Sequence, residues 1–178
     1  MKSILKVCFA VAAPVLVSLS GCASGREPLM LGEVGPAAVV PPASPQGGTL
    51  RVYSAFETGP LSPSVPENIN QHTQYTISTE GGEPLRTVAN RAGPWGEEPE
   101  SVLLPPGHYQ VEALANGNRY VKVPVLIVTG RITSVHLDNG ASRDGLDAVN
   151  PADAVRLPGG QVVGWRAEPA ASPGAGRN

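Results

Sequence analysis

The stretch that decides the fold is residues 104–138, LPPGHYQVEALANGNRYVKVPVLIVTGRITSVHLD. Apolar and polar residues alternate along three runs in it, 109–115, 121–127 and 133–137. A period of two is typical of strands that bury one face. Asn116-Gly117 separates the first two runs and favours a tight hairpin turn, and Gly130 can close a second hairpin. The stretch therefore predicts an antiparallel meander of three strands.

Three prolines in this stretch bear on where its strands begin and how they pair. Pro105 and Pro106 precede Gly107, and together they favour a turn that starts the first strand. His108 then faces solvent, so we interpret this segment as a turn rather than as a catalytic loop. Pro124 lies inside the middle run, where it lacks the N–H that a strand ladder needs. We expect a bulge there, or a strand that changes sheets.

The same alternation continues upstream, in residues 50–53 and 75–79, near Val88 and in residues 101–104. With the meander this makes about seven strands, the number and spacing typical of a two-sheet sandwich. No helical period is sustained between Gly48 and Asp138. The expected fold is all-β: a single antiparallel β-sandwich of about seven strands over residues 49–138.

A loop and a C-terminal hairpin are expected in residues 139–167, with Trp165 packed on the sandwich. An alternative for its start is a helical turn with Asn150 as N-cap and Pro151 at the first helical position, and both features can coexist. The tail, residues 168–178, has few core residues and is expected to be disordered.

The pattern of residues 1–21 is typical of an export signal. Lys2 and Lys6 are followed by the apolar run 7–17 and then by small residues. The run is well short of the roughly 20 apolar residues that span a bilayer. We therefore expect this segment to be removed.

The segment Leu19-Ser20-Gly21-Cys22 resembles the lipobox of bacterial lipoproteins. The resemblance implies cleavage before Cys22, a diacylglyceryl group on its thiol and usually a third acyl chain on its amine. Two or more chains hold a protein stably on a membrane. Ala23 follows Cys22 and no Asp stands there, which resembles the pattern of enterobacterial lipoproteins that are sent on to the outer membrane, so the expected location is the cell envelope, on the outer membrane. The alternative is an ordinary secretory signal that leaves Cys22 free.

Residues 22–48 are rich in Pro, Gly and Ala and are expected to form a lipidated tether. A flexible chain of about 25 residues has an end-to-end distance of roughly 25–30 Å. The tether would hold the sandwich off the lipid surface.

The composition excludes several classes of site. The chain has two cysteines, Cys8 in the signal and Cys22, so disulfides, Cys-ligated zinc and Cys nucleophiles are excluded from the domain. Removing Lys2 and Lys6 from 13 basic residues leaves 11 against 15 acidic, a net charge of 11 − 15 = −4. No basic stripe remains for nucleic acid.

No catalytic or cofactor-binding motif is present. The three histidines have no zinc spacing, and no nucleophile motif or phosphate-binding Gly loop occurs. We predict a protein that is not an enzyme and has no cofactor. A weaker alternative is a hydrolase that uses Ser101 or the glutamates of residues 97–100.

The loop of residues 90–99, NRAGPWGEEP, is the leading candidate for a partner contact. Binding residues often lie on loops held by a rigid scaffold. The alternative is that its tryptophan folds back and caps the core. The segment from Val65 to Gln74 is a second exposed candidate. The predicted contact residues are Trp95, Arg91, Glu97, Glu98 and His72.

The stretch 103–138 resembles the end of a prealbumin-like sandwich domain of the carboxypeptidase regulatory-like and PEGA-type families. The residues that fit the pattern are Leu104, Pro105, Gly107, Tyr109, Gly117, Val123, Val125, Gly130, Val135 and Leu137. The Pro-Glu-Gly-Ala motif of the second family is absent, because Pro106-Gly107-His108 stands in its place. The resemblance implies a prealbumin/Ig-like fold and a non-catalytic accessory role in the envelope.

We therefore expect a membrane-anchored envelope lipoprotein that acts as a non-catalytic binding or structural module. It would contact an envelope protein or a glycan, through the loop or through an exposed strand edge. The main alternative is a carbohydrate-binding module for cell-wall or exported polysaccharide.

Overall fold

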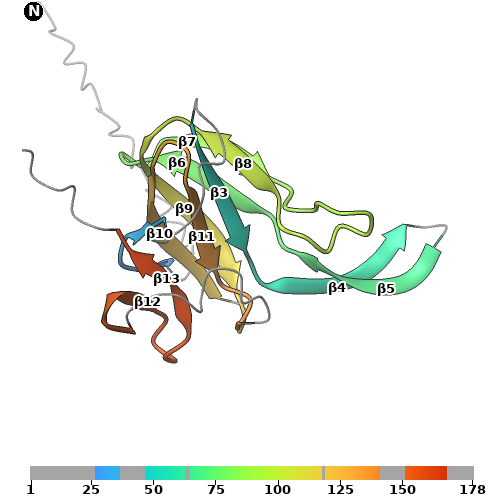
Figure 1. The fold of residues 1–178 in the computed structure, drawn as a ribbon. Coiled ribbons are helices and arrows are strands. Elements are labelled where there is room, and N and C mark those ends of the chain that lie inside the picture. The colour runs from blue at the N-terminus through green and yellow to red at the C-terminus, as the bar shows by residue number, and fades with distance from the viewer. Residues whose placement is uncertain (1–26, 37–46, 63–64, 118, 141–150, 168–178) are drawn as a thin grey trace, which may run out of the picture.

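The computed structural model describes residues 27–36, 47–62, 65–117, 119–140 and 151–167. These residues form thirteen strands and one short 3₁₀ turn, with no α-helix among them. The all-β prediction is confirmed, and two sheets that share one apolar core are consistent with a β-sandwich (Figure 1). Residues 1–21, predicted to be an export signal, Cys22 and residues 168–178 lie outside the described residues.

The larger sheet has the strand order β12-β13-β2-β10-β9-β6-β7, and β1 also pairs with β10. Its long central strands, β9 and β10, form the hairpin predicted at Asn116-Gly117. The eight strands are β1 (Leu29–Met30), β2 (Val34–Gly35), β6 (Tyr75–Thr79), β7 (Pro84–Val88), β9 (Gly107–Ala115), β10 (Arg119–Ile127), β12 (Ala154–Arg156) and β13 (Val162–Arg166).

The smaller sheet has the order β11-β3-β8. It contains β3 (Gly48–Tyr53), β8 (Ser101–Leu104) and β11 (Ile132–His136), with β11 parallel to β3. The predicted meander is therefore wrong at its third strand. The turn at Gly130, whose φ is 70°, carries the chain from β10 to the other sheet. The alternation in β11 is the same in either sheet, so the sequence could not distinguish the two pairings.

The core lies between the two sheets. Alternate side chains of β9 and β10 enter it, and the residues between them face outward. Its fully buried members come from both sheets and include Leu50, Val52, Ile77, Val111, Val123, Val125 and Val135.

The expected irregularity at Pro124 is absent, because β10 keeps an unbroken register with β9 from Arg119 to Ile127. The Lys122 carbonyl accepts a hydrogen bond from Leu31 N, so Lys122 presents its backbone polar groups toward β1. Pro124 has the same parity and points its nitrogen to the same side. Its missing N–H thus falls at the interruption between β1 and β2, where no ladder bond is needed.

Residues 27–36 were assigned to the tether, but in the structure they belong to the sheet. Leu29 pairs with Val121 and Val34 pairs with Val125, both in parallel register with β10. The Val34 side chain is completely buried in the core. Two strands of two residues each are too short to show a period, which is why the Pro/Gly-rich composition dominated the prediction.

The strands β4 (Phe56–Ser62) and β5 (Val65–His72) form a separate two-stranded sheet, which we call the arm. Figure 1 shows it extending away from the two sheets, on the opposite side from β1 and β2. At its base, Ala55 N donates to Leu114 O at 2.8 Å and Thr73 N donates to Ala55 O at 2.9 Å. The segment from Val65, expected to be an exposed stretch before the strand at Tyr75, is therefore one strand of the arm.

At the C-terminus, a 3₁₀ turn (Pro151–Asp153) leads directly into the hairpin of β12 and β13. The helical turn at Pro151 and the hairpin are therefore both present, while the predicted N-cap, Asn150, lies outside the described residues. The hairpin extends the larger sheet through β2, and Trp165 is 9% exposed. Within the described residues, no helix is long and apolar enough to cross a membrane.

Candidate partner-binding site

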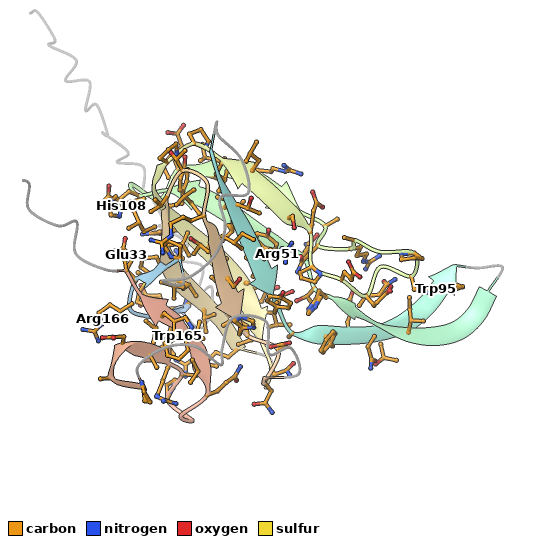
Figure 2. All side chains as sticks on the ribbon, viewed as in Figure 1. Glu33, Arg51, Trp95, His108, Trp165 and Arg166 are labelled. Atoms are coloured by element: carbon orange, nitrogen blue, oxygen red, sulfur yellow. The ribbon has the colours of Figure 1, made fainter. Side chains whose placement is uncertain are left out.

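The loop of residues 89–100, which we call the Trp95 loop, joins β7 to β8 and runs out along the arm (Figures 1 and 2). The contacts of this loop explain both its position and its shape.

Asn90 fixes the base of the loop. It has a positive φ of 61°, a conformation that Asn adopts more readily than most residues. Its buried Nδ2 donates to Val52 O and to Ser54 Oγ, each at 2.9 Å. Its Oδ1 accepts from Glu100 N at 3.0 Å. One side chain therefore joins the start and the end of the loop to β3.

The outer part of the loop is a small closed turn. Ala92 and Glu98 exchange two backbone hydrogen bonds of 2.9 and 3.1 Å. Inside this pair, Trp95 N donates to Glu97 Oε2 at 2.9 Å. Gly96 has a φ of 73°, and a Cβ there would lie 3.0 Å from Gln71 Nε2. Glycine thus allows the loop to approach the arm closely.

Two polar contacts join the loop to one face of the arm. Gln71 Nε2 donates to Trp95 O at 3.2 Å, and Arg91 forms a 2.8 Å ion pair with Glu57 Oε1. Glu57 and Gln71 are direct cross-strand partners, so their side chains lie on the same face. The Trp95 loop and the arm thus form one continuous surface.

The structure brings four of the five predicted contact residues together. Arg91, Trp95, Glu97 and Glu98 are all exposed on the loop. The alternative that Trp95 caps the core is wrong, because its side chain is 55% exposed (Figure 2). His72 differs from its prediction as a surface contact, since it is only 2% exposed.

His72 instead belongs to a stack of rings at the base of the arm, which the sequence analysis missed. Its ring stacks on Phe56 with centroids 4.5 Å apart and meets Tyr53 edge-on at 5.9 Å. Tyr53 in turn stacks on His136 at 4.4 Å, across the parallel pairing of β3 and β11. These rings come from four strands whose pairing no local sequence pattern revealed.

The protonation of His72 follows from its surroundings. Nδ1 lies 2.8 Å from Ser54 O, and because a carbonyl can only accept, Nδ1 carries the hydrogen. Burial lowers the pKa of His72 below its ordinary value of 6.5, and this outweighs the Ser54 hydrogen bond and the charge of Asp138, which raise it. The ring is therefore neutral at pH 7.

The groups proposed for hydrolysis have other partners. Ser101 Oγ accepts from Arg51 Nε at 2.9 Å, and Glu100 pairs with Arg86 at 2.8 Å. Glu97 is the acceptor for Trp95 N. In the described part of the chain, no cluster of three or more His, Cys, Asp or Glu side chains could hold a metal ion.

His108 lies on the solvent face of β9, as predicted, and far from the Trp95 loop (Figure 2). It forms a 2.6 Å contact with Glu33 Oε1. This hydrogen bond raises the pKa of His108. The pair joins β9 to the segment between β1 and β2.

Comparison with protein-family models, curated proteins and solved structures finds no match for this chain.

Proposed function

We propose that this protein is a lipid-anchored envelope lipoprotein whose arm and Trp95 loop together bind a protein partner. The protein is a non-catalytic binding module in this proposal. The anchor rests on the lipobox-like Leu19-Ser20-Gly21-Cys22.

The observation that supports binding is the exposed Trp95 on a fixed loop. Tryptophan is enriched among the few residues that supply most of an interface's binding energy. Trp95 is held through the backbone of its loop, by Asn90 at the base and by Gln71 on the arm. A preorganised loop loses less conformational freedom on binding.

The arm supports the same conclusion. An isolated two-stranded hairpin is marginally stable in water, and here the strands pair only with each other within the described residues. Such a ribbon offers backbone N–H and C=O groups at its outer edges, which an extended segment of another protein can pair with. A protein partner would use both the edge and Trp95.

Site-specific crosslinking in intact cells tests this proposal. A photoreactive residue at position 95 is compared with one at position 103, because Leu103 is equally exposed, at 57%, but lies on β8 in the smaller sheet. We expect one envelope protein to be captured from position 95 and not from position 103. Equal capture at both positions, or none at either, contradicts the proposal.

A shortened arm supplies the structural control. Thr58 and Asn70 are cross-strand partners, so joining them through Asn-Gly removes the outer arm and keeps the ring stack at its base. We expect capture from position 95 to be lost while the thermal unfolding midpoint of the sandwich stays the same. Undiminished capture would show that the arm is not part of the site.

Two further measurements separate the alternatives. Titration with envelope glycans, followed by tryptophan fluorescence in the wild type and in Trp95→Ala, tests a carbohydrate role for Trp95. A fluorescence response that is lost in the variant would show that the partner is a glycan and not a protein.

Replacing Cys22 by Ala tests the anchor and should move the protein from the membrane to the soluble fraction. Unchanged fractionation would remove the anchor from the proposal.

A further inference from the structure

A groove of about 280 Å³ lies on the outer face of the larger sheet. We call it the outer groove. Its floor comes from three adjacent strands, β6, β9 and β10, and Gly82 and Pro84 close one side. The side chains that line it are Thr76, Ser78, Gln110, Glu112 and Lys122.

Strand register arranges these side chains in rows. Thr76, Glu112 and Lys122 lie opposite one another across the three strands, and Ser78 and Gln110 form the next row. They face outward because the residues that alternate with them are buried in the core. The polar groups are therefore held on the most extensively paired part of the sheet.

The groove contains both hydrogen-bond donors and acceptors but no net charge. Lys122 Nζ lies 3.4 Å from Glu112 Oε2, so the two formal charges offset each other. An anionic ligand would meet the Glu112 carboxylate, and a cationic one would meet the Lys122 ammonium. A neutral hydroxyl can donate to the carboxylate and accept from the ammonium, and the Gln110 amide offers the same pair of functions.

An exposed aromatic ring stands beside the groove, on the same face of β10 as Lys122, which lines it. Tyr120 is 54% exposed and stands two residues before Lys122 on the same face of β10. Its ring gives an apolar surface that ends in a polar hydroxyl. The apolar C–H face of a sugar ring can pack on such a surface while its hydroxyl groups bond to the groove.

We propose that the outer groove and Tyr120 bind a neutral oligosaccharide. The volume, just under the roughly 300 Å³ of small ligand pockets, suits a few sugar units of a longer chain lying across the strands. This site shares no residue with the Trp95 loop, so it stands or falls independently of the protein-binding proposal.

Amide chemical-shift titration of the folded protein tests the site. The probes are neutral hexamers of glucose, mannose, galactose and N-acetylglucosamine, with hexamers of galacturonate and glucosamine as acidic and cationic counterparts. We expect at least one neutral hexamer to shift the amides of Thr76, Gln110 and Lys122 and to bind more tightly than either charged one. No shift from any neutral hexamer at millimolar concentration overturns the proposal, as does tighter binding of a charged one.

Two variants and a control test where the oligosaccharide binds. Gln110→Ala and Tyr120→Ala should each weaken binding of the neutral hexamer by about tenfold, the loss of roughly one good contact. Trp95→Ala is the matched control and should leave the dissociation constant unchanged. Gln110 is half-buried and Tyr120 is exposed, and neither side chain belongs to the buried core. Unchanged spectra elsewhere verify the fold. Shifts confined to the Trp95 loop, or binding lost only in Trp95→Ala, would assign the glycan to the other surface.

Discussion

At the scale of single residues, a buried amide controls the shape of the exposed site. Asn90 combines a left-handed backbone conformation with donors to Val52 and Ser54 and an acceptor for Glu100. The sequence located the loop by its Gly and Pro content but gave no sign of this role. An asparagine before a loop is common, and its partners lie up to 38 positions away in sequence.

Replacing Asn90 by Ala should lower the free energy of unfolding by about 2–3 kcal/mol. Unpaired buried polar groups cost roughly 1–3 kcal/mol each, and alanine is also disfavoured at positive φ. Asn70→Ala is the control, because Asn70 bonds Thr58 on an exposed face of the arm. Urea denaturation measures both variants, and equal losses would contradict the role given to Asn90.

The lowered pKa of His72 predicts a loss of stability in mild acid. Below about pH 6.5 the unfolded chain takes up a proton that the folded ring resists, so unfolding becomes more favourable until the folded pKa is reached. Above pH 6.5 this contribution is constant. The thermal midpoint, measured from pH 7.5 to 5, should fall less steeply in His72→Gln than in the wild type.

His108 contributes to the pH dependence of stability with the sign opposite to that of His72. Its pKa is raised by Glu33, so its contribution is present at low pH and is lost as the pH rises through that raised value. The pair is half exposed, and solvent screening makes the effect small. His108→Gln should therefore leave the acid-side slope nearly unchanged. An identical flattening in both variants would show that burial of His72 is not the cause.

At the scale of elements, burial of one face decides which strands can be predicted from the sequence. The side chains of strands such as β9 and β10 alternate between core and solvent, so the sequence shows a period of two. The arm was missed because its sequences, FETGPLS and VPENINQH, contain Gly, Pro and Asn, which are depleted in strands, and show no sustained alternation of apolar and polar residues.

The close packing of β2 on β13 gives a test at this scale. A Cβ on Gly164 would lie 2.6 Å from Val34 Cγ1 and 3.0 Å from Ser134 O. Gly164→Ala should therefore destabilise the fold by about 1–3 kcal/mol through overpacking. Gly159→Ala is the matched control in the same hairpin, because a Cβ there meets nothing within 4 Å. A neutral Gly164→Ala would mean that β2 and β13 separate readily.

At the scale of the whole molecule, the N-terminal segment joins two parts of the larger sheet, because β2 lies between β13 and β10. A chain that begins at residue 27 keeps β1 and β2, and one that begins at residue 47 lacks both. Burying one valine such as Val34 contributes roughly 1.5–3 kcal/mol, and 1 kcal/mol shifts the midpoint of a small domain by about 4–8 °C. The shorter chain should melt at least about 5 °C below the longer one, as measured by circular dichroism. Equal midpoints would place residues 27–36 outside the cooperative unit.

The position of β1 also changes how far the protein can stand from a bilayer. Leu29 is already held in the sheet, and it follows Cys22 by only 29 − 22 = 7 residues. Even fully extended, seven residues reach at most about 25 Å. An acylated Cys22 would therefore keep the β1 side of the sandwich close to the lipid headgroups, and the arm, which extends on the opposite side, would point away from them.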